Sequence, residues 1–258
     1  MVFSELYQYR EMIRSLVRRD LVGRYKKSFL GFLWTFVDPL MQLIVYTFVF
    51  TVIMPVSNIE HFYLHLFVAL IPWNFYSSCL AGGCMCIINQ QDMVKKIYFP
   101  REILPISYVT SQFVNMALSF IVVFAVLLIS GTGINPVVIW CIIPVMLIQY
   151  MLCIGVTLLT SAITVYFRDL QQILSVVTLA LMYASPVIYS VDMVPESIRA
   201  QYMFNPMSAL IVSYRDILYY KRFPDGRYLL QAGITSLIVL LAGYFAFNNM
   251  ERRFVEEL

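Results

Sequence analysis

Apolar segments of about 20 residues or more alternate with short polar connections along most of the chain. An α-helix needs about 20 apolar residues to cross a hydrocarbon core of about 30 Å. The pattern therefore predicts an all-α integral membrane protein with six transmembrane helices, of which the fifth is the shortest. The expected spans are residues 29–54, 62–88, 103–130, 136–164, 171–189 and 228–249.

The first 28 residues have a different pattern, in which apolar and cationic residues occupy opposite faces of a helix. Apolar residues recur at helical spacing, as at Tyr9, Ile13 and Leu16, and the arginines occupy the other face of the helix. A helix of this kind lies in the membrane interface rather than crossing the membrane. We therefore predict an amphipathic cytoplasmic interface helix over residues 1–28 and a transmembrane domain over residues 29–258.

The connection between the fifth and sixth spans, residues 190–227, is long and partly apolar. Asn205-Pro206 predicts a helix start, with Asn205 as N-cap and Pro206 at the first helical position. The helix that follows, over Met207–Leu218, is too short to cross a membrane but apolar enough to enter one. We predict a re-entrant outer segment here, and an ordinary amphipathic helix at the outer surface is the alternative.

The composition excludes a soluble globular protein. Of the residues, 60% are hydrophobic and 13% are charged, and the mean hydropathy is +0.76. A soluble domain carries about 25% charged residues. The net charge of +3 is small, and the basic residues are not interleaved with aromatic ones on a soluble face, so no nucleic-acid partner is expected. All five cysteines fall in apolar stretches, which argues against a disulfide framework.

The basic residues are distributed unevenly between the two sides of the predicted membrane. Seven of the 18 Lys and Arg residues lie in the first 28 positions, and six more lie in the connections after spans two and four and in the C-terminal tail. The other five all lie in the outer connection. Because segments rich in Lys and Arg stay in the cytoplasm, both termini are predicted to be cytoplasmic.

Four groups of short motifs follow one another on this six-span layout. They are Arg24-Tyr25 with Gly31-Phe32-Leu33-Trp34 and Asp38-Pro39; Lys95-Lys96-Ile97-Tyr98-Phe99-Pro100-Arg101 with Leu104-Pro105; Tyr166-Phe167-Arg168-Asp169; and Ser185-Pro186-Val187-Ile188-Tyr189 with Val194-Pro195-Glu196, Asn205-Pro206 and Arg215. On these residues, which extend over almost the whole chain, the sequence resembles the membrane subunit of a bacterial polysaccharide-exporting ABC transporter of the type-2 class. Members of that family move O-antigen, capsule or teichoic-acid polymers.

The resemblance implies a permease subunit that binds no cofactor and is not itself an enzyme. None of the ten glycines precedes a lysine, so the chain lacks the usual Gly-rich phosphate loop that ends in Lys and Ser or Thr. In the family two permeases pair with two ATPase subunits, which bind ATP and Mg, and the polymer path lies between the permeases. We therefore expect a homodimer with two such ATPases, in contact with membrane lipids of the bacterial cytoplasmic (inner) membrane, that transports a lipid-linked polysaccharide.

The connection after the second span is the expected ATPase-docking site, because the family places a short docking helix there. Lys95, Lys96 and Arg101 would supply charge at the rim of the contact. Ile97, Tyr98 and Phe99 would form an exposed apolar anchor. A plain cytoplasmic loop that only fixes the topology is the alternative.

A lipid-linked polymer with a diphosphate would seek cations near the cytoplasmic face. Arg24, Lys26, Lys27 and Arg168 are the candidates, since arginine binds phosphate through two parallel hydrogen bonds. The alternative is that these residues only determine the topology.

Aromatic residues could line a sugar path, because sugar C–H faces stack on aromatic rings and Tyr hydroxyls bond sugar hydroxyls. The alternative is the aromatic belt at the two membrane interfaces. Asp38, the only acid well inside a span, either lines the path or faces headgroup water. The channel-lining candidates are Trp34, Asp38, Trp73, Tyr76, Tyr183 and Tyr189, and the outer-gate candidates from the resemblance are Pro186, Pro195, Asn205, Pro206 and Arg215.

Two other functions compete with export. An intramembrane lipid-linked glycan transferase needs convergent acids, bases or a metal, and an ion-coupled secondary transporter commonly has internal repeats and ionisable groups at the bilayer midplane. The spans contain one Asp and no repeat. Glu60, His61 and His65 are too few for a metal site and are expected at a solvated junction, so no metal is predicted.

Overall fold

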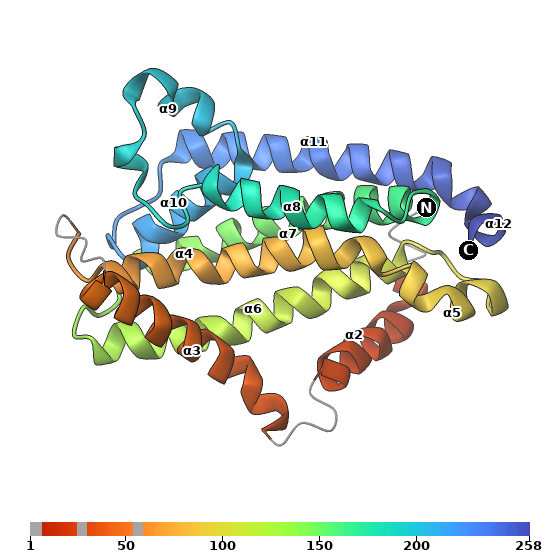
Figure 1. Ribbon diagram of the computed structural model, residues 1–258, viewed down its shortest axis with the longest axis horizontal. Helices are drawn as coiled ribbons and strands as arrows, with labels where there is room; N and C mark the ends of the chain where they lie inside the picture. The colour runs from red at the N-terminus through yellow and green to blue at the C-terminus, as the bar shows by residue number, and fades with distance from the viewer. Residues whose placement is uncertain (1–6, 25–29, 54–58) are drawn as a thin grey trace.

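The computed structural model describes residues 7–24, 30–53 and 59–258. Within these residues every regular element is a helix, and the long helices form an elongated bundle (Figure 1). The helices are α2 (Arg10–Arg24), α3 (Trp34–Phe48), α4 (Phe62–Ser77), α5 (Gln91–Lys96), α6 (Ile103–Ile129), α7 (Ile142–Tyr166), α8 (Leu170–Tyr183), α9 (Glu196–Tyr202), α10 (Pro206–Leu218), α11 (Gly226–Met250) and α12 (Phe254–Glu257).

Among the described residues, five helical segments are long and apolar enough to cross a membrane, and they fall where the first, second, third, fourth and sixth spans are predicted. Several are lengthened by 3-10 or π turns that continue α3, α4, α7 and α11. The chain is therefore an all-α integral membrane protein, as predicted. The segments are Gly31–Ile53, Phe62–Met85, Ile103–Ile129, Val138–Tyr166 and Gly226–Arg253.

The prediction for the fifth span, residues 171–189, is wrong at its C-terminal end. The helix α8 has 14 residues and stops at Tyr183. Pro186 disfavours a helical conformation at Ser185, so the chain leaves the helix before the proline. Fourteen residues extend about 21 Å, which is less than the thickness of the hydrocarbon core. That α8 crosses the membrane, which would make six crossings in all, therefore stays a prediction.

The helices α7 and α11 make the closest contact in the bundle, because two glycines face each other where they cross. A methyl group on Gly155 would lie 2.6 Å from the backbone of Leu240, and one on Gly243 would collide with the carbonyl oxygen of Gly155. Small residues at such crossings let two membrane helices approach closely.

The helix α4 lies at the centre of the bundle, whereas α3 lies at its edge. In the most apolar window of Phe62–Met85, 78% of the residues are buried, compared with 11% in Gly31–Ile53. The helix α3 buries only Thr35 and Pro39. It is inclined to α4 and α6, as Figure 1 shows, so it contacts both without packing along either.

The helix predicted within residues 1–28 is observed as α2, which packs against α6. Leu16 is buried, and Ser111 of α6 donates a hydrogen bond to the carboxylate of Asp20 at 3.2 Å. The side chains of Arg14 and Arg18 are exposed. The amphipathic pattern therefore separates a bundle-facing side from a cationic one.

Candidate functional site

A polar cavity of about 270 Å³ lies between α3, α4 and α6, inside the part of the chain expected to span the membrane. Its wall carries a carboxyl group, several side-chain amides and several hydroxyl groups. Polar groups at this depth are costly unless they have partners. The lining residues are Trp34, Thr35, Asp38, Pro39, Gln42, Ile71, Asn74, Phe75, Ser77, Ser78, Gln112, Asn115, Met116 and Ser119.

Helical spacing brings these side chains together. Asp38 and Gln42 are four residues apart on α3, so they share a face, and Gln112, Asn115 and Ser119 share a face of α6. The amide nitrogen of Asn74 on α4 donates a hydrogen bond to the side-chain oxygen of Gln42 at 2.9 Å, which ties α3 to α4.

One of these groups lacks a partner among the described residues. The side-chain oxygen of Asn115 is buried there without a hydrogen bond, and Gln112 lines the same wall one helical turn before it. Buried amides are normally bonded. The cavity wall therefore offers an unused acceptor.

At the opposite end of the bundle, Arg215 of α10 holds an irregular loop against α4. Its guanidinium donates to the carbonyl oxygens of His65 at 3.0 Å, Val187 at 2.7 Å and Tyr189 at 3.0 Å, and also to that of Pro186. Arg215 is only 2% exposed. We call this arginine and the loop residues 185–189 the outer cluster.

The helix α10 runs beside the first half of α4. At its start, Met207 lies near Gln149, which donates to the carbonyl oxygen of Pro72 at 2.8 Å. At its end, the hydroxyl of Tyr219 donates to the carbonyl oxygen of Glu60. Along the axis of α4, the distance from Pro72 back to Glu60 is roughly 18 Å. The helix α10 lies beside α4 over about that distance.

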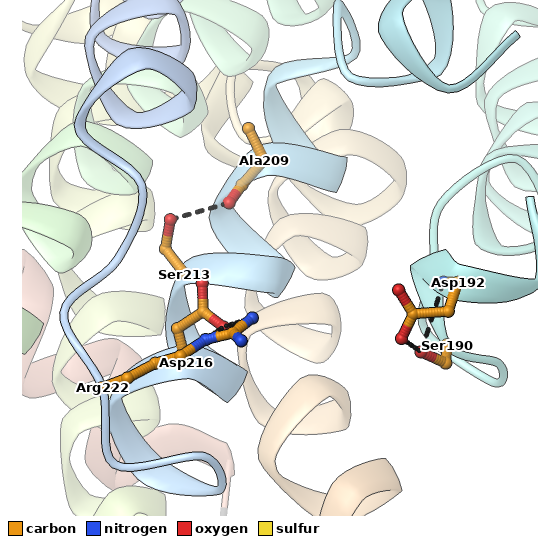
Figure 2. A network of polar contacts seen from close by, with 6 residues as sticks. All are labelled: Ser190, Asp192, Ala209, Ser213, Asp216 and Arg222. Carbon is orange, nitrogen blue, oxygen red and sulfur yellow. Dashed lines mark hydrogen bonds and ion pairs between the residues drawn. The ribbon is translucent and has the colours of Figure 1, made fainter. Parts of the chain in front are cut away.

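An ion pair closes the end of α10. The guanidinium of Arg222 forms an ion pair with the carboxylate of Asp216, with 2.7 Å between Nη2 and Oδ1 (Figure 2). The backbone N–H of Arg222 also donates to the Asp216 carbonyl oxygen at 2.8 Å. Burial raises the pKa of the Asp216 carboxyl group, and the hydrogen bond and charge of Arg222 oppose that rise. The chain turns sharply here, with Lys221 in the left-handed region at a φ of 56°.

The expected docking residues lie in the last turn of α5 and in the segment that follows it, at the end of the bundle remote from the outer cluster. Tyr98 is 95% exposed and Ile97 is 58% exposed, beside exposed Lys95 and Lys96. The expectation of an exposed anchor is wrong for Phe99, which is 5% exposed and packs in a buried cluster with Ile103 and Phe254.

Arg101 is half-buried rather than free at the rim. It donates a hydrogen bond to the carbonyl oxygen of Glu251, and so fixes the turn after α11. Around these residues a groove of about 590 Å³ includes Tyr98, Tyr244 and Arg252.

Known proteins resemble this chain over most of its length. The model of the family described as ABC-2 type transporter matches residues 11–219. The chain belongs to the ABC-2 type transporter family. It is 36% identical over 259 residues to the protein named O-antigen export system permease protein RfbA of Myxococcus xanthus, covering 98% of each chain.

Two further relatives carry similar names. An O-antigen export system permease protein RfbA of Klebsiella pneumoniae is 28% identical over 248 residues, which cover 96% of this chain and 95% of the relative. The capsule polysaccharide export inner-membrane protein CtrC of Neisseria meningitidis serogroup A is 22% identical over 206 residues, covering 77% and 75%.

In this ABC-2 type chain the predicted channel-lining residues do not form one group. Only Trp34 and Asp38 line the polar cavity. Trp73 is 4% exposed and packs 5.7 Å, between ring centroids, from half-buried Tyr76. Tyr183 is exposed near the other end, where its carbonyl oxygen accepts from the hydroxyl of Tyr189 at 2.6 Å.

The predicted cations are only partly described. Arg24 is the last residue of α2, Arg168 is exposed between α7 and α8, and Lys26 and Lys27 lie outside the described residues. Among the described residues no group of three or more His, Cys, Asp or Glu side chains could hold a metal ion. His65 is 1% exposed, so its expected place at a solvated junction is wrong, because α4 begins before it and α10 covers it.

Two of the predicted outer-gate residues, Asn205 and Pro206, lie at a helix start, where the sequence places one. The Asn205 side-chain oxygen accepts from the Met207 N–H at 3.0 Å, so Asn205 caps α10 and Pro206 follows at its first position. Its amide nitrogen donates to the Ser185 hydroxyl at 2.9 Å, which joins the cap to the outer cluster. Pro195 is exposed before α9.

The amides of the cavity were not among the site residues predicted from the sequence. Gln42, Asn74, Gln112 and Asn115 each stand in an apolar span, and that position is itself a signal of function in a membrane helix. The spacing of Asp38 and Gln42, and of Gln112 and Asn115, could have been read as two polar helix faces. Only the fold shows that these faces meet.

Proposed function

We propose that this chain is the permease subunit of an ATP-driven exporter that moves a lipid-linked polysaccharide across the bacterial cytoplasmic membrane. The observation that carries the proposal is the 36% identity to an O-antigen export permease over 98% of both chains. The polar cavity inside the apolar bundle agrees with a hydroxyl-rich substrate.

Energy for export would come from a separate ATPase subunit, which would bind the ATP and Mg. The face after α5 is its docking site in this proposal. Exposed Ile97 and Tyr98 supply an apolar contact, and Lys95 and Lys96 supply charge at the rim. Phe99 does not contact the ATPase in this proposal, because its side chain packs inside the permease beneath the exposed residues.

Two copies of the chain would enclose the polymer path. The helix α3 exposes Met41, Ile44 and Phe48, and α8 exposes Val176 and Leu179. Large exposed apolar faces of this kind meet lipid or another protein. We propose that one copy contributes such a face to the other, with the termini of both in the cytoplasm.

The outer segment would form the gate on the far side. The helix α10 follows the outer half of α4, and a helix of 13 residues cannot cross a bilayer. We propose that it enters the membrane and returns, and that the outer cluster keeps it in place between transport cycles.

The test is to purify the protein from its native membrane in mild detergent and to identify what comes with it. The proposal expects an ATPase subunit in equal amount and polymer export that requires ATP. A chain that purifies alone and transports or transforms a substrate without ATP would contradict it.

A further inference from the structure

One amide on the cavity wall, Asn115, differs from the buried amide of Gln149 in its internal partners. Gln149 of α7 uses both ends of its amide: the nitrogen donates to the Pro72 carbonyl oxygen at 2.8 Å and the oxygen accepts from the Tyr214 hydroxyl at 2.8 Å. By contrast, the Asn115 oxygen is unpartnered among the described residues. Gln149 is built as a structural amide and Asn115 is not.

The chemistry of the wall fits a neutral ligand rich in hydroxyl groups. Amides donate and accept hydrogen bonds, a carboxylate accepts them, and serine hydroxyls do both. No Lys or Arg of the described chain lines the cavity, which argues against a phosphate. Trp34 adds an aromatic ring on which the C–H face of a sugar can stack.

The size of the cavity sets the size of the ligand. Sites for drug-sized molecules measure about 300–1,000 Å³, and this cavity has about 270 Å³. It therefore fits a single sugar unit and not a polymer segment.

The walls also contain an irregular helix turn. Ser77 ends α4 and the chain continues as a π turn over Ser78–Gly82, where the Tyr108 hydroxyl donates to the Ser78 carbonyl oxygen at 3.2 Å. Turns of this type inside a helix occur frequently at functional sites. The third wall, α3, buries only Thr35 and Pro39 within the chain, and both of these residues line the cavity.

We propose that this cavity is a carbohydrate subsite within one protomer, which holds a single sugar unit of the transported polymer. Asn115 and Gln112 bond its hydroxyls, Asp38 accepts from them, and Trp34 stacks on its ring. The proposal rests on the proposed export function. The subsite as proposed has its three walls on one chain, whereas the proposed polymer path lies between two protomers.

Photo-crosslinkers placed inside and outside the cavity test the location. p-Benzoylphenylalanine replaces Gln42, which lines the cavity, or Leu241 of α11, which is exposed and outside it. Exporting cells are irradiated, and the purified permease is stained for polymer. We expect polymer on the Gln42 variant and little on the Leu241 variant. Polymer on the Leu241 variant at an equal or higher level, or on neither variant while export continues, overturns the subsite but not the export function.

The same cells with polymer synthesis switched off separate the two sources of sugar. Glycan that still crosslinks at Gln42 belongs to a membrane glycolipid, and it overturns the assignment to the polymer. Absence of export in the unmodified cells is a different result, since it contradicts the proposed function itself.

A pair of amide substitutions separates binding from structure. Asn115→Leu removes an amide whose oxygen has no partner among the described residues, so we expect an unchanged or higher melting temperature. Export should slow about tenfold through the loss of one or two sugar hydrogen bonds. Gln149→Leu removes a paired amide, so it lowers the melting temperature and leaves export per folded molecule unchanged. Export by Asn115→Leu at the unmodified rate overturns the role of Asn115.

Discussion

Arg215 binds four backbone carbonyl groups through one side chain, and Arg215→Met removes all of these bonds with little change of volume. An acceptor left without a partner costs about 1–3 kcal/mol, and the release of a buried charge offsets part of that sum. Some loop carbonyls will regain water when the loop opens. We therefore expect the free energy of unfolding to fall by about 3 kcal/mol.

Two measurements follow this change. Thermal unfolding of the purified permease in detergent reports the overall stability, and hydrogen exchange of the amides in residues 185–190 reports the outer cluster. Exchange should accelerate there far more than in α7. Arg215→Lys keeps the charge but cannot span the same carbonyls, so its effect should be intermediate.

Arg227→Met is the matched control, because Arg227 is exposed and no pairing of its side chain is found among the described residues. Its effect should stay within about 0.5 kcal/mol. A free energy of unfolding of Arg215→Met that stays within about 1 kcal/mol of the unmodified protein, with hydrogen exchange in the loop unchanged, would contradict this role of Arg215. The conformation of residues 185–189 would then not depend on Arg215.

Five further substitutions test the close helix crossing, the docking surface and the cap of α10. Gly243→Ala should lower the melting temperature and the free energy of unfolding, the latter by about 1–3 kcal/mol, because a methyl group there meets the α7 backbone. Gly233→Ala on the same helix has room for the methyl group and should be neutral or stabilising. Equal effects of the two substitutions would contradict the close crossing. Phe99→Ala should lower the free energy of unfolding by about 3–5 kcal/mol, because the ring is buried. Tyr98→Ala should leave the melting temperature unchanged and weaken co-purification of the ATPase, because the ring is exposed. The reverse pattern would contradict the docking surface. Asn205→Ala should cost about 0.5–2 kcal/mol in thermal unfolding, and no loss would contradict its capping role.

Features encoded locally were predictable from the sequence. The length of an apolar run decides whether a helix can span, so five of the expected spans are observed as long apolar helices. The cap at Asn205 was equally predictable, because the preference for Asn followed by Pro at a helix start depends on neighbouring residues alone.

Features that depend on distant contacts were not predictable. Phe99 belongs to a cationic connection and was expected to be exposed, but Phe254, from the other end of the chain, covers the same cluster. The loop after α8 has no periodic pattern, and its conformation is set by an arginine about 30 residues later. The polar cavity requires three helices to converge, and no single helix contains that information.

Polymer translocation in proteoliposomes tests the central claim most directly. The permease and its co-purified ATPase are reconstituted together with the lipid-linked polysaccharide, and polymer on the side opposite the ATPase is measured with a polymer-degrading enzyme. We expect translocation that requires ATP and stops when the ATPase lacks the lysine of its phosphate loop. Translocation that proceeds equally without ATP, or none with the complete complex and ATP, would contradict the assignment as an export permease.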